Sequence, residues 1–458
     1  MLCARKDCRM RAIVYIFSFI SFGLFVRYLG TGDSVTKTRK QTALKGLPSA
    51  SFRANLRNDT FYVTTWPSAG FTNQFMGYVN MIYLATITER TPILPPFIPY
   101  KIIGTDAGLL PFGDVFDLEH LSSQLRISVL EWRDVKKLPT PTDADPYLYV
   151  PNSKAHLSES LGCWSTKASY ESQPARCNQL VRHIGVDVAY TRVPATTRYK
   201  PEDPKEIHVV FSQLAALIYR SPSPLFSDLG RSPFFDPKEH PETFDYMSPS
   251  PKGLDITPEH HLACFDSLYY VTSGASSFEW KYGFSPAWRY VGRYLRFSEN
   301  LQMLTQQYLN TLFPKSIPPF IAVHARRGDF DWPCGKHLCF PPLSVYQKQV
   351  DVVRKELGEI LGIEVNNVVL MSDETAPEFW ANVKAIGWLS VDHGTHLTIE
   401  RYGPWYPTLI DIVIQSCAIG FVGTEDSTLS IVSQRRVMDW NGGAIRSVNI
   451  RDLEQYSS

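Results

Sequence analysis

One loop of the 458-residue chain gathers side chains that suit the binding of a phosphate group. His324, Arg326 and Arg327 come at the end of an apolar run typical of a buried strand, and Asp329 and Asp331 follow them. An arginine guanidinium is planar and always charged, so it can bind a phosphate or diphosphate through two parallel hydrogen bonds. The structural alternative is an ion-paired cluster, in which Arg326 or Arg327 binds Asp329 or Asp331.

Two further segments have the composition of ligand-binding turns. Residues 423–428 follow an apolar run and precede a helical pattern, and backbone N–H groups at such a helix start bind anions. Ordinary N-capping by Thr424 or Asp426 would give the same pattern without a ligand. In the second segment, Gly70 permits close approach of a ligand to the backbone, and Asn73 can both donate and accept hydrogen bonds.

Two Asp-x-Asp patterns, at residues 143–145 and 329–331, match a short motif of metal-dependent sugar transferases. The second pattern lies beside Arg326 and Arg327, which would compete with a cation for the same diphosphate. We therefore expect a site that uses no metal ion.

The elements that carry these loops form an α/β pattern. The last third predicts strands at 320–324, 368–371, 388–391 and 418–422, helices at 376–386 and 407–417, and a helix that opens at 424–428. Near the start, a strand at 61–66, a helix at 73–88 and a strand at 92–96 form a βαβ unit. This alternation predicts doubly wound parallel sheets, in which ligands bind beyond the carboxyl ends of the strands. We expect the first domain at 60–315 and the second at 316–458. The first would contain long loops, since eleven prolines fall between residues 194 and 258.

The first sixty residues predict a membrane anchor. Residues 12–30 are apolar over almost their whole length, and four basic residues in the tail 1–11 predict a cytoplasmic N-terminus. A cleaved signal peptide is the alternative. A polar stem at 31–59 would then lead to a catalytic region in the lumen of the endoplasmic reticulum or Golgi, in a single-pass type II arrangement. Asn58 begins a glycosylation sequon.

The cysteines fit a luminal body. Beyond the anchor the chain has six: Cys163, Cys177, Cys264, Cys334, Cys339 and Cys417. An even number in an oxidising compartment predicts disulfides, and closeness in sequence favours Cys163–Cys177 and Cys334–Cys339. A zinc site around His337 is the alternative for the second pair. The near-balance of 46 basic and 45 acidic residues argues against a nucleic-acid partner.

Taken together, the loops resemble the GDP-fucose protein O-fucosyltransferase family, within the fucosyltransferase superfamily that shares a His-x-Arg motif. The segment 70–74, followed by 90–96, looks like the first nucleotide-sugar loop of that family. The run from His324 to Asp329 looks like its His-x-Arg signature. Residues 411–423, then Ser427 and Thr428, look like its third region.

The resemblance implies two Rossmann-like domains facing a cleft, the GT-B type, with GDP-fucose as donor, no cofactor and no metal. Arg326 and Asn73 would be the catalytic residues, His324 and Arg326 would hold the diphosphate, and Asp411 would lie on the guanine side. The donor-binding residues that it implies are Gly70, Phe71, Thr72, Asn73, His324, Ala325, Arg326, Asp411, Ser427 and Thr428.

The implied reaction is an inverting transfer of fucose to Ser or Thr hydroxyls of luminal proteins. Some relatives place a glutamate in the first loop as general base, whereas this chain has Ser68 and Ala69 there. Asp329, Asp331 or a substrate-assisted route could take that role. A glycan acceptor is one alternative, and a binding protein without turnover, which the missing glutamate favours, is another.

Overall fold

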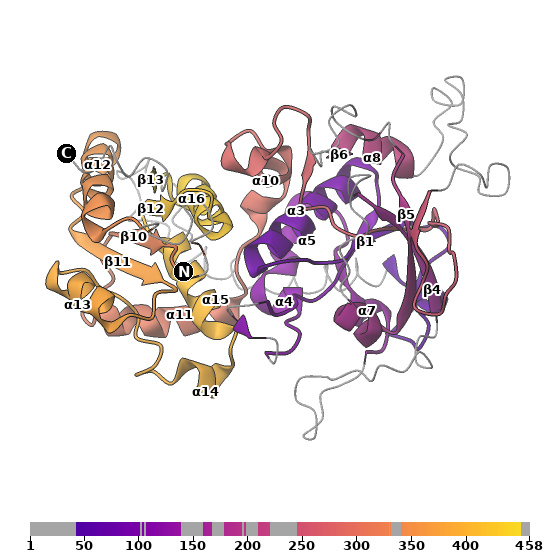
Figure 1. Ribbon diagram of the computed structural model, residues 1–458, viewed down its shortest axis with the longest axis horizontal. Coiled ribbons are helices and arrows are strands. Elements are labelled where there is room, and N and C mark those ends of the chain that lie inside the picture. Colours follow the sequence, from indigo (N-terminus) through magenta and orange to yellow (C-terminus); the bar gives the residue numbers. More distant parts are fainter. Residues whose placement is uncertain are drawn as a thin grey trace, which may run out of the picture. The chain divides into compact units, whose positions relative to one another are not determined.

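The computed structural model describes residues 43–100, 103–104, 107–138, 159–166, 178–194, 197, 209–219, 245–328, 330 and 340–449. These residues fold as two compact α/β units, 43–296 and 297–449, each with its own sheet and core (Figure 1). The division comes earlier than the expected boundary at 315/316. The reason is α11 (Glu299–Leu312), whose Leu304 and Leu309 pack in one core with Phe320 of the second unit.

The first unit is built on a seven-stranded sheet with the order β3-β2-β1-β8-β4-β5-β7. Its pairs are parallel except β5 with the edge strand β7. The strands are β1 (Tyr62–Thr65), β2 (Thr91–Leu94), β3 (Leu130–Glu131), β4 (Glu159–Ser165), β5 (Val186–Arg192), β7 (Tyr246–Ser248) and β8 (Leu262–Phe265), with the separate parallel pair β6 (Val209–Val210) and β9 (Val271–Thr272). The helices are α2 (Phe52–Asn55), α3 (Phe71–Ile87), α4 (Phe112–Val115), α5 (Leu118–Leu125), α6 (Trp132–Val135), α7 (Asn178–Ile184), α8 (Phe211–Ile218) and α10 (Pro286–Tyr290), with 3-10 turns at Glu279–Lys281 and Gly292–Tyr294. The expected βαβ unit is thus confirmed as β1, α3 and β2.

The described part of the expected stem is packed against this unit. Phe52 and Leu56 have no exposed surface and belong to the same core as Tyr62 of β1. The Phe52 ring meets Trp132 edge-on at 5.7 Å between centroids. The prediction of a tether up to residue 59 is therefore wrong for residues 43–59. Asn58 lies exposed in the turn that follows, and its glycosylation stays a prediction.

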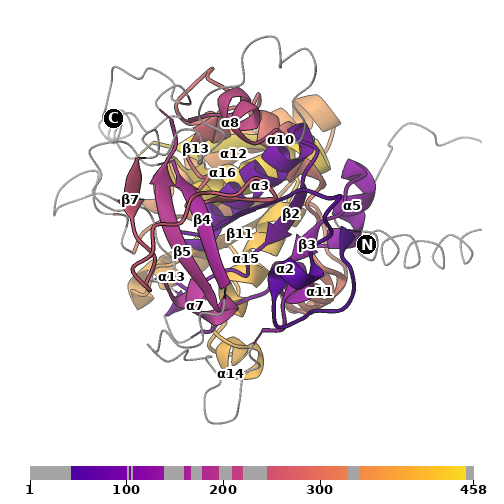
Figure 2. The ribbon, with the colours of Figure 1, turned by 90° about the vertical axis from the view of Figure 1, so that its right-hand side faces the viewer.

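A disulfide joins Cys163 on β4 to Cys264 on β8, two neighbouring strands; the two cysteines are 101 residues apart in sequence. Figure 2 shows β4 beside its other neighbour in the sheet, β5. The predicted Cys163–Cys177 pair is therefore wrong, because the parallel sheet brings distant segments together and spacing along the chain carries no information about them. Cys177 itself, like Cys334 and Cys339, lies outside the described residues.

The second unit is a three-layer α/β/α arrangement around a parallel sheet with the order β11-β10-β12-β13. Its strands are β10 (Phe320–Ala325), β11 (Asn367–Ser372), β12 (Gly420–Thr424) and β13 (Ala444–Val448). Its helices are α11, α12 (Leu343–Leu361), α13 (Pro377–Ala385), α14 (Thr398–Tyr402), α15 (Tyr406–Cys417) and α16 (Thr428–Asn441).

Alternate residues of β10 face opposite layers of this unit. Ile321 and Val323 pack in the core formed with α12 and α13, whereas Phe320 and Ala322 pack in the core formed with α11, α15 and α16. Helices on both faces of a parallel sheet are the doubly wound arrangement that the sequence predicts. The predicted strand at 388–391 is reduced to a single bridge between Leu389 and Val369 of β11.

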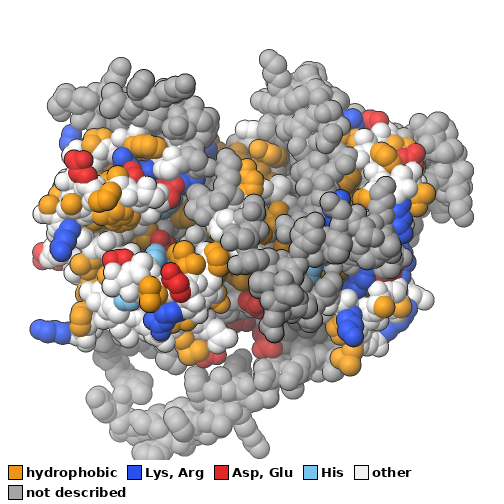
Figure 3. Space-filling model, turned by 60° about the horizontal axis from the view of Figure 1, so that its bottom comes forward, with side chains coloured by type: hydrophobic (Ala, Val, Ile, Leu, Met, Phe, Trp, Pro, Cys, Tyr) orange, Lys and Arg blue, Asp and Glu red, His pale blue; other side chains and the backbone are white. Residues whose placement is uncertain are grey.

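Among the described residues, no helix has the length and apolar character needed to cross a membrane. The predicted anchor at 12–30 lies outside those residues and stays a prediction. On the face shown in Figure 3, the coloured basic and acidic side chains are interspersed with apolar ones.

Candidate active site

His324 lies at the carboxyl end of β10 and faces the first turn of α16. It is 5% exposed, and its Nδ1 is 2.8 Å from Ser430 Oγ. Burial, with the charge of Arg326 as a second cause, lowers the pKa of His324 to about 3. The imidazole is therefore neutral at physiological pH. One of its nitrogens carries a proton and can donate a hydrogen bond, and the other can accept a hydrogen bond.

The surroundings of Ser430 indicate which nitrogen carries that proton. Ser430 Oγ accepts a hydrogen bond from the backbone N–H of Thr424 at 3.1 Å. The hydroxyl still has its own proton to donate, and His324 Nδ1 is the ring nitrogen within reach. This arrangement favours the tautomer with the proton on Nε2, which makes Nε2 a hydrogen-bond donor that suits an anionic ligand.

The Thr424 hydroxyl, at the end of β12, connects the site to the rest of the unit. It has no exposed surface. Thr424 Oγ1 accepts from the backbone N–H of Arg326 at 2.8 Å and donates to the carbonyl of His324 at 3.1 Å. Tyr346 of α12 lies 2.8 Å away through its own hydroxyl. One side chain thus holds the backbone that presents His324 and Arg326.

Each of the two arginines has an acidic partner from the segment after β11. The Arg326 guanidinium is paired with Asp373, and Arg327 Nε lies 2.5 Å from Glu374 Oε2. The backbone N–H of Arg327 also donates to Asp373 Oδ1 at 2.7 Å. The structural alternative that the sequence left open, pairing with Asp329 or Asp331, involves residues outside those that the structure describes. The sequence did indicate that Asp373 and Glu374 lie at the end of a predicted strand, where site residues are expected.

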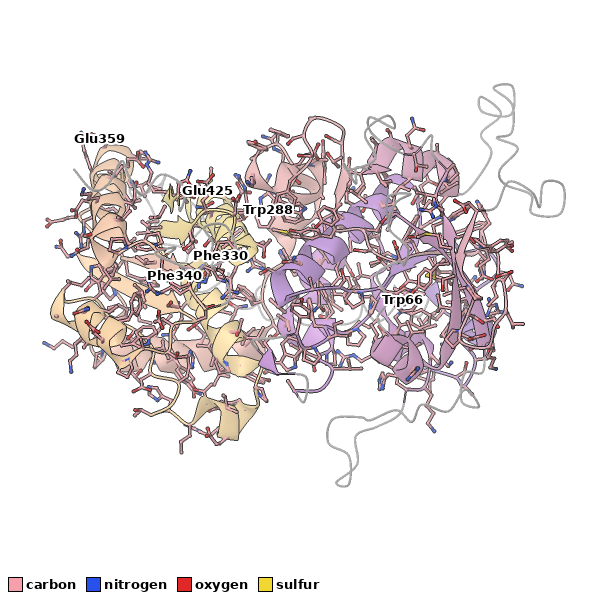
Figure 4. The ribbon with its side chains drawn as sticks, in the orientation of Figure 1. Trp66, Trp288, Phe330, Phe340, Glu359 and Glu425 are labelled. Atoms are coloured by element: carbon pink, nitrogen blue, oxygen red, sulfur yellow. A yellow bond between two sulfur atoms is a disulfide. The ribbon has the colours of Figure 1, made fainter. Side chains whose placement is uncertain are left out.

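Aromatic rings distinguish the two arginines further. The Arg327 guanidinium carbon lies 4.7 Å from the Phe340 ring centroid and 4.8 Å from that of Phe379, so two rings and a carboxylate surround it. The Arg326 guanidinium carbon lies 5.8 Å from the centroid of the Phe330 ring. Figure 4 labels Phe330 and Phe340. This enclosure gives Arg327 a packing role.

The loop between the arginines and Phe330 depends on a glycine. Gly328 adopts a φ of +47°, in the region that side chains disfavour, and a Cβ there would collide with the Asp373 carboxylate. The Asp373 carboxylate can therefore lie against the loop that presents Arg326.

The start of α16 supplies backbone donors beside this cluster. Ser427 is the N-cap residue, 4% exposed, and its side chain makes no capping hydrogen bond, so the predicted caps Thr424 and Asp426 do not take that role. Gly423 lets the helix approach β12, because a Cβ there would come within 2.7 Å of Ser430 Cβ. The first N–H groups of a helix have no partner within the helix, and together with its dipole they favour an anion.

The predicted loop of the first unit lies at the carboxyl end of β1. Gly70 is the N-cap of α3, so the helix begins at Phe71, two residues before the predicted start. Phe71 is buried against Phe97 at 4.6 Å between ring centroids, and Thr72 is buried too. Gln74 fixes the loop, since its amide donates to the carbonyls of Ala69 and Ile98. Among the four residues predicted to bind the donor from this loop, Gly70 and Asn73 are the partly exposed ones.

Asn73 lines a small, partly open pocket in this unit. Ser68, Trp66 and Thr65 form part of its wall. The buried atoms Thr65 Oγ1 and Trp66 Nε1 have no hydrogen-bond partner among the described residues (Figure 4 labels Trp66). Buried polar atoms of this kind are normally satisfied by a ligand or by water.

Asp411 lies on α15 in the second unit. Its Oδ1 is 3.1 Å from His393 Nε2. The structure therefore brings His324, Ala325, Arg326, Ser427 and Thr428 to one sheet edge and places Asp411 in the same unit.

Comparisons with known proteins identify a family for this chain. A family model described as GDP-fucose protein O-fucosyltransferase matches residues 62–438. Among solved structures, POFUT1 in complex with GDP-fucose is 17% identical, with a TM-score of 0.46 over 86% of this chain and 98% of that one. Fucosyltransferase NodZ from Bradyrhizobium is 12% identical, with a TM-score of 0.34 over 82% and 92% of the two chains. No curated protein matches the chain.

Two α/β units with charged and hydroxyl side chains at a carboxyl strand edge are typical of nucleotide-binding enzymes. The family match spans most of the chain and includes residues of both units, so the chain belongs to the GDP-fucose protein O-fucosyltransferase family. It is accordingly a glycosyltransferase.

Proposed function

We propose that this protein transfers fucose from GDP-fucose to Ser or Thr hydroxyls of proteins in the secretory lumen, with inversion at the anomeric carbon. One observation carries the proposal. Within a chain of this family, Arg326 is fixed through Thr424 and Asp373 at the sheet edge where α16 begins.

The chemistry requires stabilisation of a leaving diphosphate. The bond between the fucose anomeric carbon and the β-phosphate oxygen breaks, and the acceptor oxygen forms the new bond. Negative charge grows on GDP as it leaves, and a fixed arginine with backbone N–H groups stabilises such charge without reorganising. The charges of Arg326 and Arg327 are balanced by Asp373 and Glu374. The attraction between these arginines and a diphosphate therefore acts only at short range.

The acceptor hydroxyl loses a proton in the same step. Asp329 and Asp331 follow Arg326 in sequence and are our candidates for the general base, with the donor phosphate as the substrate-assisted alternative. Asn73 would contact the donor or acceptor from the first unit, next to the unsatisfied polar atoms of the pocket that it lines.

The luminal location is part of the proposal. The apolar run 12–30 behind four basic residues supports a type II anchor in the endoplasmic reticulum or Golgi. The Cys163–Cys264 disulfide supports an oxidising compartment, since such bonds are rare in the cytosol.

The Arg326→Ala variant tests the assignment. With full-length protein, radiolabelled GDP-fucose and secretory-protein acceptors, we expect a loss of transfer of about 10²-fold or more, because a preorganised donor to the leaving group is removed. The matched control is Arg446→Ala, which breaks an ion pair with Glu356 on the half-exposed surface of the same unit and should keep activity. Full turnover by Arg326→Ala would overturn the proposal. Release of the label by N-glycosidase instead of β-elimination would indicate a glycan acceptor, and GDP-fucose binding without any transfer would indicate a binding protein.

A further inference from the structure

We propose that His393 is a positioning residue that fixes the Asp411 carboxylate for recognition of a guanine base. The inference rests on the proposed function, because a GDP-fucose donor brings a guanine base to the site, and on the place beside that base that the family resemblance implies for Asp411. It concerns a chain of hydrogen bonds, from Tyr308 through Thr398 and His393 to Asp411, that the family resemblance did not indicate.

The chain connects three helices and the loop before α14. His393 Nε2 lies 3.1 Å from Asp411 Oδ1, and His393 Nδ1 lies 3.1 Å from Thr398 Oγ1. The Thr398 hydroxyl lies 2.8 Å from the Tyr308 hydroxyl of α11. Thr398 has no exposed surface and Tyr308 is 4% exposed, so the far end of the chain is anchored in the core.

Both ring nitrogens of His393 have partners in this chain. A carboxylate oxygen accepts, so His393 Nε2 donates a hydrogen bond to Asp411. On the other side of the ring, Nδ1 is hydrogen-bonded to the Thr398 hydroxyl, which is hydrogen-bonded to the Tyr308 hydroxyl. Each hydrogen bond fixes the next, so the Asp411 carboxylate is held in one orientation.

The loop that carries His393 is itself fixed. Asp392 accepts from the Thr395 backbone N–H at 2.9 Å and from its hydroxyl at 2.7 Å. The backbone N–H of Thr398 donates to the carbonyl of His393 at 3.0 Å. Leu397 adopts a φ of +50°, a conformation that the surrounding turn must enforce. The loop therefore presents the His393 imidazole in one direction.

The position of this loop fits a part in donor binding. Leu389 bridges Val369 of β11 in parallel register, and β11 ends three residues later at Ser372. His393 therefore lies beyond the carboxyl edge of the same sheet whose β10 presents Arg326. The side chain that recognises the base and the groups that bind the diphosphate would then lie at the same carboxyl edge of the sheet in the second unit.

The second carboxylate oxygen of Asp411 indicates which nucleobase this residue would bind. Within the part of the chain that the structure describes, Oδ2 of Asp411 makes no hydrogen bond, and the side chain is 21% exposed. A carboxylate oxygen accepts hydrogen bonds and has none to donate. Guanine offers adjacent donors, N1–H and the 2-amino group, whereas adenine offers an acceptor at N1. A carboxylate held in place therefore prefers guanine over adenine, and one that is free to rotate loses part of that preference.

The test compares nucleotide binding by full-length His393→Ala and wild type, with GDP, IDP and ADP measured by calorimetry. Loss of a hydrogen bond to a charged group predicts about tenfold weaker GDP binding, unchanged ADP binding, and a GDP-over-ADP preference reduced by the same factor. In transfer assays KM for GDP-fucose should rise while kcat at saturating donor stays constant. In an Asp411→Asn background, His393→Ala should add no further loss.

Two controls separate positioning from a structural role. His396→Ala removes another histidine of the same loop, which packs on the same Tyr308 ring at 5.0 Å. Among the described residues Asp411 is hydrogen-bonded to His393 and not to His396, so this variant should keep the wild-type preference. His393→Gln retains an amide donor and should restore part of the preference, and it remains informative if the alanine variant does not fold.

An unchanged GDP-over-ADP preference in both His393 variants would overturn this inference alone, as would an equal loss in His396→Ala. Absence of GDP binding by wild type would overturn the proposed function and this inference with it.

Discussion

Replacing Thr424 by valine removes the hydroxyl that holds the backbone of His324 and Arg326, and valine keeps nearly the same shape. Two of the hydrogen bonds that this change breaks are fully buried, those with the Tyr346 hydroxyl and with the His324 carbonyl. A buried polar group that loses its partner costs about 1–3 kcal/mol. Since two such groups lose theirs, we expect Thr424→Val to lower the free energy of unfolding of residues 297–449 by about 4 kcal/mol.

Urea unfolding with site-resolved hydrogen exchange in β10 and β12 measures this change, since the chain has two units and a single global transition cannot be assumed. The matched control is Thr424→Ser, which keeps the hydroxyl and loses only a methyl group, at a cost of about 1 kcal/mol. GDP binding should weaken in the valine variant and not in the serine variant, because only valine releases the Arg326 backbone. Equal stability and equal GDP binding of the two variants would refute the role given to the hydroxyl network.

Acid should destabilise the second unit through His324. Its folded pKa of about 3 lies below the unfolded value of about 6.5, so this stability is present above pH 6.5 and is lost as pH falls towards 3. Between pH 7 and pH 5 the loss is about 2 kcal/mol by urea unfolding, and a His324→Asn variant with the same pH dependence as wild type would contradict this. Removing the disulfide with the double change Cys163→Ala and Cys264→Ala should lower the stability of residues 43–296 by about 4 kcal/mol, given its loop of 101 residues. An unchanged urea midpoint under reducing and oxidising conditions would argue against that bond.

The sequence predicted the second unit well because its strands are short, apolar and bounded by polar residues. The expected strands 320–324, 368–371 and 418–422 match β10, β11 and β12 within two residues, so the site residues at their carboxyl ends were found with them. The strand β13 was missed, and the order of the strands in the sheet was not predicted, since apolar runs carry no signal for their neighbours.

Contacts between residues on neighbouring strands could not be predicted from the local sequence. Asp373 and Glu374 were seen as polar residues after a strand, but their pairing with Arg326 and Arg327 follows from β11 lying beside β10. The same limit applies to Cys264, whose partner is distant in sequence. The packing of residues 43–59 had a weak signal.

In that segment the apolar residues Phe52 and Leu56 are four positions apart. Such spacing places both side chains on one side of a helical turn. The core of the first unit could therefore have been expected to cover them.

Protein O-fucosylation is tested most directly by the incorporation of radiolabelled sugar into secretory proteins by the purified full-length protein, with GDP-fucose and a panel of other GDP- and UDP-sugars as donors. We predict label from GDP-fucose alone, its release by alkaline β-elimination, and its loss in Arg326→Ala. Transfer from another nucleotide sugar with none from GDP-fucose would contradict the assignment of GDP-fucose as donor.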